Sequence, residues 1–222
     1  MNIIYLLFHG LSPYSGISKK ILHQVKGFEA CGHRVSLCTY SIADNGHRVR
    51  MINNEIIEDY GTGKPAAAKR RVSYQCIYRY AITHQVELIY VRSFHNANPF
   101  TIRLFSKLRK AGIKIAMEIP TYPYDSEYAG FPLVTRLGIQ VDKVFRKTLA
   151  KHVNAIVTFS DYHCIFGQRT IQISNGVDFD SIPLKKTVSK NTSVIHLLGV
   201  AEVHYWHGYD RLIEGLGKYY QN

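Results

Sequence analysis

Four polar side chains that could recognise a carbohydrate lie close together in the segment EIPTYPYD, residues 118–125. Glu118 and Asp125 supply carboxylates, and Tyr122 and Tyr124 supply hydroxyl groups and flat apolar ring faces. The two prolines of the segment restrict its backbone, so these groups are held in place. The combination suits a sugar acceptor, whose hydroxyls need hydrogen bonds and whose ring faces need flat partners. A purely structural aromatic loop is the alternative.

Two earlier loops carry groups that suit an anion. In HGLSPYSGIS, Tyr14 and Ser15 precede Gly16, which opens an expected helix and lets a ligand approach free backbone N–H groups. This segment is neither the dinucleotide fingerprint G-x-G-x-x-G nor a P-loop, and a tight turn is the alternative. In RSFHN, Arg92 suits a phosphate or carboxylate, and His95 is either structural or catalytic.

A fourth loop, VAEVHYWHG, comes near the end of the chain. Gly208 begins an expected helix, whose N-terminus favours an anion. Glu202 and His207 are candidates to line this site. A protonated His207 could stabilise a leaving diphosphate, because useful donors point to where charge develops.

Hydrophobic patterning indicates the elements that must position these loops. Short apolar runs alternate with amphipathic helical segments, which predicts an α/β fold with a doubly wound, Rossmann-like parallel sheet. In such a sheet, ligands bind beyond the carboxyl ends of the strands, where the four loops lie. Strands are expected at 2–8, 34–40, 88–91, 113–117, 155–159, 170–173 and 194–200, with one or two weaker strands within 49–58; helices are expected at 16–31, 66–84, 99–111, 133–149 and 208–220.

The pattern also predicts a boundary between domains. Residues 1–181 form the α/β domain, and the polar, proline-containing residues 182–193 read as a linker. Residues 194–222 look like the first strand, loop and helix of a second, incomplete α/β domain.

The net charge of the chain limits the kinds of partner that it is expected to bind. The chain has 28 Lys and Arg against 16 Asp and Glu, a formal net charge of +12. A basic surface can meet nucleic acid, anionic lipid or a phosphorylated substrate, and solvated helix faces are the alternative. No nucleic-acid-reading motif is recognisable, so specific nucleic-acid binding is not expected.

Cysteine usage and hydropathy predict the compartment. No pair of the four cysteines has CxxC spacing, so no metal site is expected. Residues 3–8 are apolar but too short to span a bilayer, and no targeting segment is recognisable. We therefore expect a cytoplasmic location.

Several segments, in order, resemble one family. GHRVSLCTY is similar to a second strand of the form G-H-x-V, NAIVTFSDY to a strand and serine before the next helix, and ISNGVD to an NGVD crossing between lobes. VAEVHYWHGYDRLIEGL is similar to VGRLxxxKGxxxLIxAL. Together they resemble the amino-terminal domain, with the start of the second, of a family-4 glycosyltransferase of the GT-B fold. The resemblance covers nearly all of the chain.

The resemblance implies a function. It implies retaining transfer of a hexose from a nucleotide-diphosphate sugar to a saccharide or lipid-linked acceptor, with no cofactor or metal. Residues 1–181 would bind the acceptor, and 194–222 would belong to a donor-binding lobe. The residues it points to are Tyr14, Ser15, Gly16, Arg92, His95, Tyr122 and Tyr124 for the acceptor, and Glu202, His207 and Gly208 for the donor.

Departures from the family pattern change what is expected of the chain. Glu202 and His207 stand where the family has its Arg and Lys, and Pro120 stands where a His is usual. Glu118 or Asp125 would then have to serve in catalysis. The family's acidic E-x7-E motif does not occur before Asn222, so the chain alone is expected to need a second lobe for activity.

Two further expectations complete the hypothesis. The alternative to a transferase lobe is a non-catalytic sugar- or lipid-binding module, or a subunit of a split transferase. Under the leading hypothesis, a basic face would hold the lobe at the inner face of the membrane through peripheral contact with anionic lipid.

Overall fold

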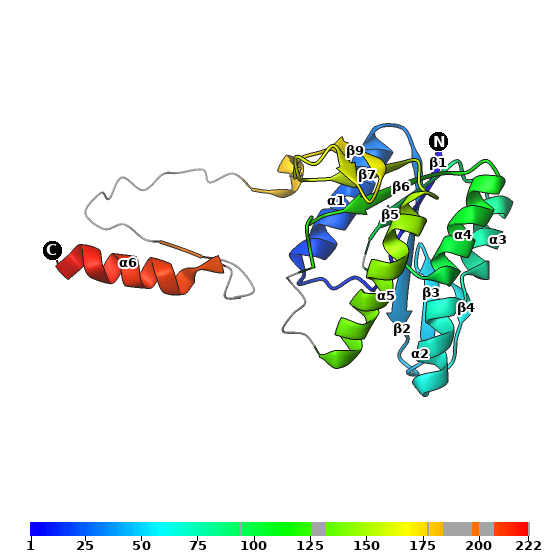
Figure 1. The fold of residues 1–222 in the computed structure, drawn as a ribbon, viewed down its shortest axis with the longest axis horizontal. Coiled ribbons are helices and arrows are strands. Elements are labelled where there is room, and N and C mark those ends of the chain that lie inside the picture. Colours follow the sequence, from blue (N-terminus) through cyan, green and yellow to red (C-terminus); the bar gives the residue numbers. More distant parts are fainter. Residues whose placement is uncertain (94, 126–131, 177, 184–196, 200–206, 222) are drawn as a thin grey trace. The chain divides into compact units, whose positions relative to one another are not determined.

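The computed structural model describes residues 1–93, 95–125, 132–176, 178–183, 197–199 and 207–221 (Figure 1). The chain divides into two units, Met1–Phe179 and Asp180–Asn222, which are considered separately. The strands of the first unit are β1 Asn2–Leu6, β2 Arg34–Ile42, β3 Arg48–Ile52, β4 Glu55–Asp59, β5 Leu88–Arg92, β6 Lys114–Ile119, β7 Ala155–Thr158, β8 Cys164–Ile165 and β9 Gln168–Gln172. Its α-helices are α1 Gly16–Ala30, α2 Gly63–Val72, α3 Gln75–Thr83, α4 Pro99–Lys110 and α5 Leu133–Ala150.

The first unit is an α/β structure, as expected. Within the described residues the strands form one sheet in the order β4-β3-β2-β1-β5-β6-β7-β9-β8. Its centre, from β2 through β1, β5, β6 and β7 to β9, is parallel, which is compatible with a Rossmann-like fold.

The expectation of a parallel sheet is wrong at both edges. β3 runs antiparallel to β2 and β4, and β8 runs antiparallel to β9. Two turns reverse the chain at the first edge: one between β2 and β3, where Gly46 has φ of +79°, and one between β3 and β4, where Asn53 and Asn54 have φ of +48° and +71°. Two successive residues with positive φ form the tight turn that closes a hairpin, and asparagine tolerates this region well.

Both faces of the sheet are covered. On one face, Ile21 of α1 packs with Ile3 and Tyr5 of β1. On the other face, Ile4 and Leu6 of β1 share a core with side chains of α3, α4 and α5. Successive strand residues point to opposite faces, so a strand between two helix layers must be apolar throughout. That requirement explains why β1 is apolar from Ile3 to Leu6.

Two segments differ from the predicted elements. The helix predicted at 66–84 is two helices, because Ser73 is extended and its carbonyl accepts a hydrogen bond from the Tyr60 hydroxyl at 3.3 Å. The helix implied after Ser160 is replaced by the β8–β9 hairpin, in which Phe166 and Gly167 both have positive φ.

The second unit is described only in part. It contains a short 3-10 helix, η1, which begins in the first unit (Phe179–Ser181), and helix α6, Tyr209–Gln221, close to the helix predicted at 208–220. Residues 197–199 of the strand predicted at 194–200 have no regular structure, and the rest of it lies outside the described residues. The linker and the donor-lobe boundaries therefore stay predictions. In the described part of the chain, no helix combines the length and apolarity needed to cross a membrane.

Gly10, after β1, gives a prediction on stability. A Cβ at this position would lie 2.8 Å from the carbonyl oxygen of Tyr40 in β2, a backbone atom that cannot easily move. We expect Gly10→Ala to lower the free energy of unfolding by about 1–3 kcal/mol. Gly27→Ala within α1, where an added Cβ meets nothing within 4 Å, is the control and should stabilise by about 0.5–1 kcal/mol. Equal urea midpoints for the two variants would contradict the close approach at Gly10.

Candidate anion-binding cavity

A cavity of about 740 Å³ lies at the carboxyl ends of β1, β5 and β6, beside the N-terminus of α1. This is the edge of the sheet where the sequence placed the candidate loops. The cavity brings together five of the predicted acceptor residues from three separate loops: Ser15, Gly16, Arg92, His95 and Tyr124.

The N-terminus of α1 forms one wall. Ser15 caps the helix, and its hydroxyl oxygen accepts a hydrogen bond from the Ser18 N–H at 3.4 Å. The Ser18 hydroxyl oxygen in turn accepts one from the Ser12 N–H at 2.9 Å, which fixes the approach to the helix. Gly16 and Ile17 both line the cavity, and a Cβ on Gly16 would meet nothing within 4 Å. The N–H groups of Gly16 and Ile17, which have no acceptor within the helix, are therefore open to a ligand.

Two cations line the same cavity. Arg92 comes from the end of β5, and Lys20 lies one turn into α1, its ammonium 3.5 Å from the ring centroid of Phe159. Burial lowers the pKa of Lys20, while the charge of Glu118 opposes that shift. None of the described residues that line the cavity is Asp or Glu. Glu118, which does not line the cavity, pairs with Arg92, so the N-terminus of α1 and Lys20 carry most of the positive charge that favours an anionic ligand.

Hydroxyl, amide and imidazole groups complete the lining. They come from Ser12, Ser93, Thr121, Asn175, His9 and His95. His95 has φ of +47°, and its ring lies 4.5 Å from that of Tyr124. Burial lowers the pKa of His95, so its imidazole is neutral at neutral pH and can accept a proton. The cavity could therefore hold an anion and hydrogen-bond a hydroxylated ligand at the same time.

Glu118 lies beneath the cavity rather than in its lining. Its side chain is 0% exposed and forms an ion pair with Arg92, its register partner on the neighbouring strand β5. The other carboxylate oxygen accepts hydrogen bonds from the Tyr90 hydroxyl at 2.6 Å and the Gln24 amide at 2.8 Å. Burial, and then the charge of Glu118, raise the pKa of Tyr90, so its hydroxyl keeps its proton and remains a donor. Glu118 is thus placed to hold Arg92 at the cavity wall.

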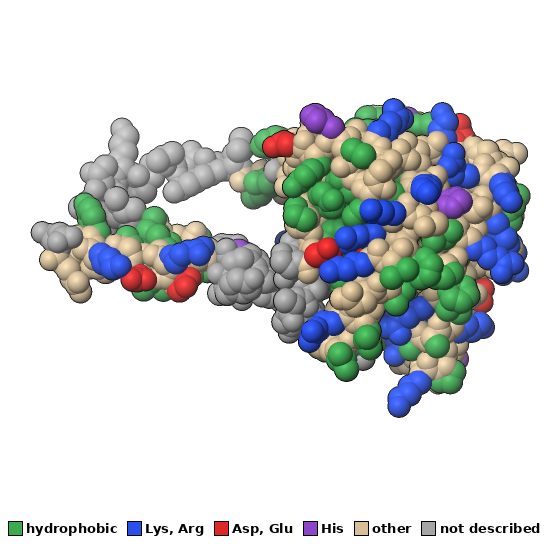
Figure 2. Space-filling model, in the orientation of Figure 1, with side chains coloured by type: hydrophobic (Ala, Val, Ile, Leu, Met, Phe, Trp, Pro, Cys, Tyr) green, Lys and Arg blue, Asp and Glu red, His purple; other side chains and the backbone are tan. Residues whose placement is uncertain are grey.

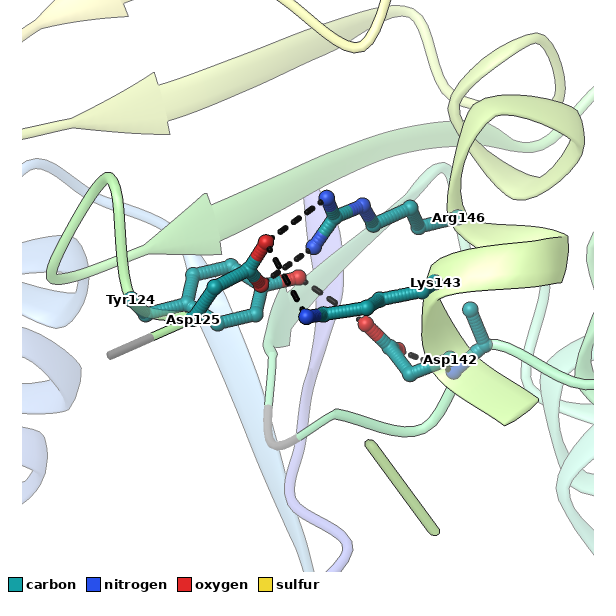
Figure 3. Close-up of polar contacts among 6 residues, drawn as sticks. Tyr124, Asp125, Asp142, Lys143 and Arg146 are labelled. Carbon is teal, nitrogen blue, oxygen red and sulfur yellow. Dashed lines mark hydrogen bonds and ion pairs between the residues drawn. The ribbon is translucent and has the colours of Figure 1, made fainter. Parts of the chain in front are cut away.

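Asp125 binds α5 instead of facing the cavity (Figure 3). Its two oxygens accept hydrogen bonds from the Arg146 guanidinium at 2.7 and 3.1 Å, and Lys143 lies 3.5 Å away. Beside it, the Tyr124 hydroxyl donates to Asp142 at 2.9 Å. These contacts attach the loop that carries Tyr122 and Tyr124, the tyrosine loop, to α5. They also fix the ring of Tyr124 where it lines the cavity.

The Asp125 contacts predict a dependence on pH. The hydrogen bonds from Arg146 hold the pKa of Asp125 below its usual value. A lowered folded-state pKa contributes stability that is present above the unfolded value, about 4, and is lost as pH falls through the folded value. Asp125→Asn should therefore lower the melting temperature at pH 7 and have less effect near pH 3. Because Asp125 is 39% exposed, we expect less than about 1 kcal/mol. An equal effect at both values of pH would contradict this assignment.

The other predicted residues lie elsewhere. Tyr14 is 94% exposed and outside the cavity lining. Tyr122 packs edge-on against Tyr162 and Phe166, with ring centroids 4.9 and 5.5 Å apart. His207 and Gly208 belong to the second unit, and Glu202 lies outside the described residues. Whether these residues bind donor or acceptor stays a prediction.

Sequence reasoning missed three polar residues that build the site. Lys20 and Gln24 follow Gly16 at intervals of four, which places all three along one side of α1. That spacing is a signal that could have found them. Asp142 is buried within α5, where it accepts hydrogen bonds from the Tyr124 hydroxyl and the Ala97 N–H. A lone carboxylate on the inward side of an amphipathic helix is the corresponding signal.

Comparisons with known proteins do not add to this geometry. Protein-family models, curated proteins and solved structures give no match to the chain. Within the described residues, no three His, Cys, Asp or Glu side chains come together to hold a metal ion.

Proposed function

We propose that this chain is the acceptor-side lobe of a glycosyltransferase of the GT-B fold, and that the cavity at the start of α1 binds the acceptor. The lobe would take part in retaining transfer of a hexose from a nucleotide-diphosphate sugar to a saccharide or lipid-linked acceptor, and would need a second lobe for activity. The observation that carries the proposal is the cavity lining, which joins a helix N-terminus and two cations to hydroxyl groups and a tyrosine ring.

The lining suggests which part of the acceptor binds where. A phosphate of the acceptor would lie against the N–H groups of Gly16 and Ile17, within reach of Lys20 and Arg92. The sugar hydroxyls would meet the serine, threonine and asparagine side chains, and a ring face would meet Tyr124. A lipid-linked saccharide, which carries phosphate next to sugar, has both parts.

Glu118 and Asp125, predicted to be catalytic, receive positioning roles in this proposal. Glu118 holds Arg92 and Asp125 holds the tyrosine loop, and neither lines the cavity. The same observation favours one alternative, a non-catalytic sugar- or lipid-binding module or a subunit of a split transferase. The coding sequence beyond position 222 separates the two: a continuation into an E-x7-E segment supports the transferase lobe.

Calorimetric titration of the chain tests the binding part of the proposal. The ligands are a hexose 1-phosphate, the neutral hexose, and UDP- and GDP-hexoses. We expect the hexose phosphate to bind at least about tenfold more tightly than the neutral hexose, as one charge-assisted contact would give. Nucleotide sugars should bind weakly, because in this proposal the cavity of the first unit binds the acceptor and not the donor. Equal affinity for the charged and neutral hexoses would contradict an anion-binding acceptor cavity.

A further inference from the structure

The outward side of α5 carries an apolar stripe. Leu133, Leu137, Val141 and Val144 are 67%, 57%, 46% and 71% exposed. Their spacing of four, four and three residues places them along one side of the helix. The opposite side of α5 holds the helix to the domain through the buried Leu149 and Ala150. The four exposed side chains are therefore not needed for packing of the first unit.

Cations border this stripe. Arg136, Lys147 and Lys151 are exposed, and their spacing places them next to the apolar side chains. Arg109 of α4 adds a further cation at this end, because its guanidinium donates to the Lys151 carbonyl at 2.8 Å. In the view of Figure 2, hydrophobic and basic side chains lie together over the region of α5.

Among the residues that the structure describes, acidic side chains are scarce on the same surface. The only acidic residue of α5 is Asp142, which is 2% exposed and lies within the fold. Asp125 lies beside the helix, but Arg146 and Lys143 pair with it. A cationic border around an apolar stripe is complementary to a surface that is anionic outside and apolar beneath, as an anionic bilayer is. An apolar stripe bordered by Lys and Arg is typical of a helix that lies on an anionic membrane.

We propose that the outward side of α5 docks on an anionic lipid surface. The helix would lie in the plane of the interface, with the leucines and valines among the acyl chains and the cations against the headgroups. At 18 residues, α5 is about 27 Å long, so the whole stripe can engage at once. This surface extends the proposed function, because a lobe held at the membrane meets a lipid-linked acceptor. It rests on α5 alone, however, and is tested without any sugar, so either proposal can fail without the other.

Sedimentation with vesicles tests the surface. The chain is mixed with phosphatidylcholine vesicles, or with vesicles in which part of that lipid is replaced by phosphatidylglycerol. Two double variants change the stripe and its border separately: Leu137→Ser with Val144→Ser, and Lys147→Glu with Lys151→Glu. The matched control, Lys19→Glu with Lys64→Glu, makes the same change in charge at exposed positions on α1 and α2. Circular dichroism checks that each variant is folded.

The proposal predicts how strongly the chain and each variant bind to the two kinds of vesicle. The chain should bind the anionic vesicles, and each α5 double variant should bind them at least about tenfold more weakly, since each basic residue near the surface contributes on the order of a fivefold factor. The control should remain within about threefold of the parent. Equal binding to both kinds of vesicle would overturn the proposal. A loss of binding in the control as large as in the α5 variants would also overturn it, because it would show attraction by net charge alone. Full binding by the variant Leu137→Ser with Val144→Ser would overturn it as well.

Discussion

Replacing Glu118 with alanine is expected to lower the free energy of unfolding by about 3–5 kcal/mol. The substitution leaves the guanidinium of Arg92, which is 7% exposed, without its carboxylate partner. It also removes the acceptor of the Tyr90 hydroxyl and of the Gln24 amide. Buried donors that lose their acceptor bear the full cost of desolvation, so several penalties add at one position. Urea unfolding at pH 7 measures the change.

Two other variants separate the effect of Glu118→Ala from the smaller effect of losing an exposed ion pair. Glu58 lies 3.9 Å from Lys69 and 3.7 Å from Arg79, whose side chains are 54% and 66% exposed, so Glu58→Ala should cost less than about 1 kcal/mol. The double variant Arg92→Met with Glu118→Leu removes both charges and should recover part of the loss. If Glu118→Ala is no more harmful than Glu58→Ala, the buried network is not what holds Arg92.

The second large effect is on ligand binding. Lys20→Glu is expected to weaken binding of a hexose 1-phosphate by about tenfold to a hundredfold. The change removes a charge-assisted contact, worth about 1.5–3 kcal/mol, and adds a carboxylate to a lining that has none among its described residues. Because the pKa of Lys20 is lowered, binding by the parent chain should also weaken as pH rises toward that value, where the ammonium loses its proton. Titration calorimetry at two values of pH measures both.

Lys19→Glu is the matched control. It makes the same change in net charge one residue earlier in α1, but Lys19 is exposed and does not line the cavity. We expect affinity within about twofold of the parent, since a water-exposed charge that does not contact the ligand is weakened by solvent and screened by salt. Equal losses in the two variants would mean that the chain attracts anions by its net charge and not through this cavity.

The architecture of the sheet followed from local patterns, and its irregularities did not. The apolar run of β1 identifies a strand covered on both faces, and the glycine after α4 marks the end of that helix. The β3–β4 hairpin at one edge depends on paired positive φ values at Asn53 and Asn54, which asparagine permits but does not dictate. The break between α2 and α3 depends on Tyr60, which lies outside both helices, so helical spacing within 66–84 could not reveal it.

The sequence predicts where the site lies better than it predicts what each residue does there. Carboxyl ends of parallel strands meet at one edge, so Ser15, Arg92 and Tyr124 were expected near one another, and all three line the cavity. The role of Glu118 depends on register: β5 and β6 pair so that Arg92 stands beside Glu118. Similarly, only the position of α5 shows that Arg146 reaches Asp125. Contacts between separate helices and strands decide which carboxylates remain available to a ligand in the cavity.

The most direct test of the central claim is a nuclear magnetic resonance titration of the ¹⁵N-labelled chain with a hexose 1-phosphate. If the cavity binds the charged part of an acceptor, the backbone amide signals of Gly16, Ile17 and Ser93 should shift in a saturable way. The neutral hexose should shift them much less. Shifts confined to the basic end of α2, at Lys69 to Arg71, or no saturable shift at the start of α1, would contradict an acceptor-binding cavity at this edge of the sheet.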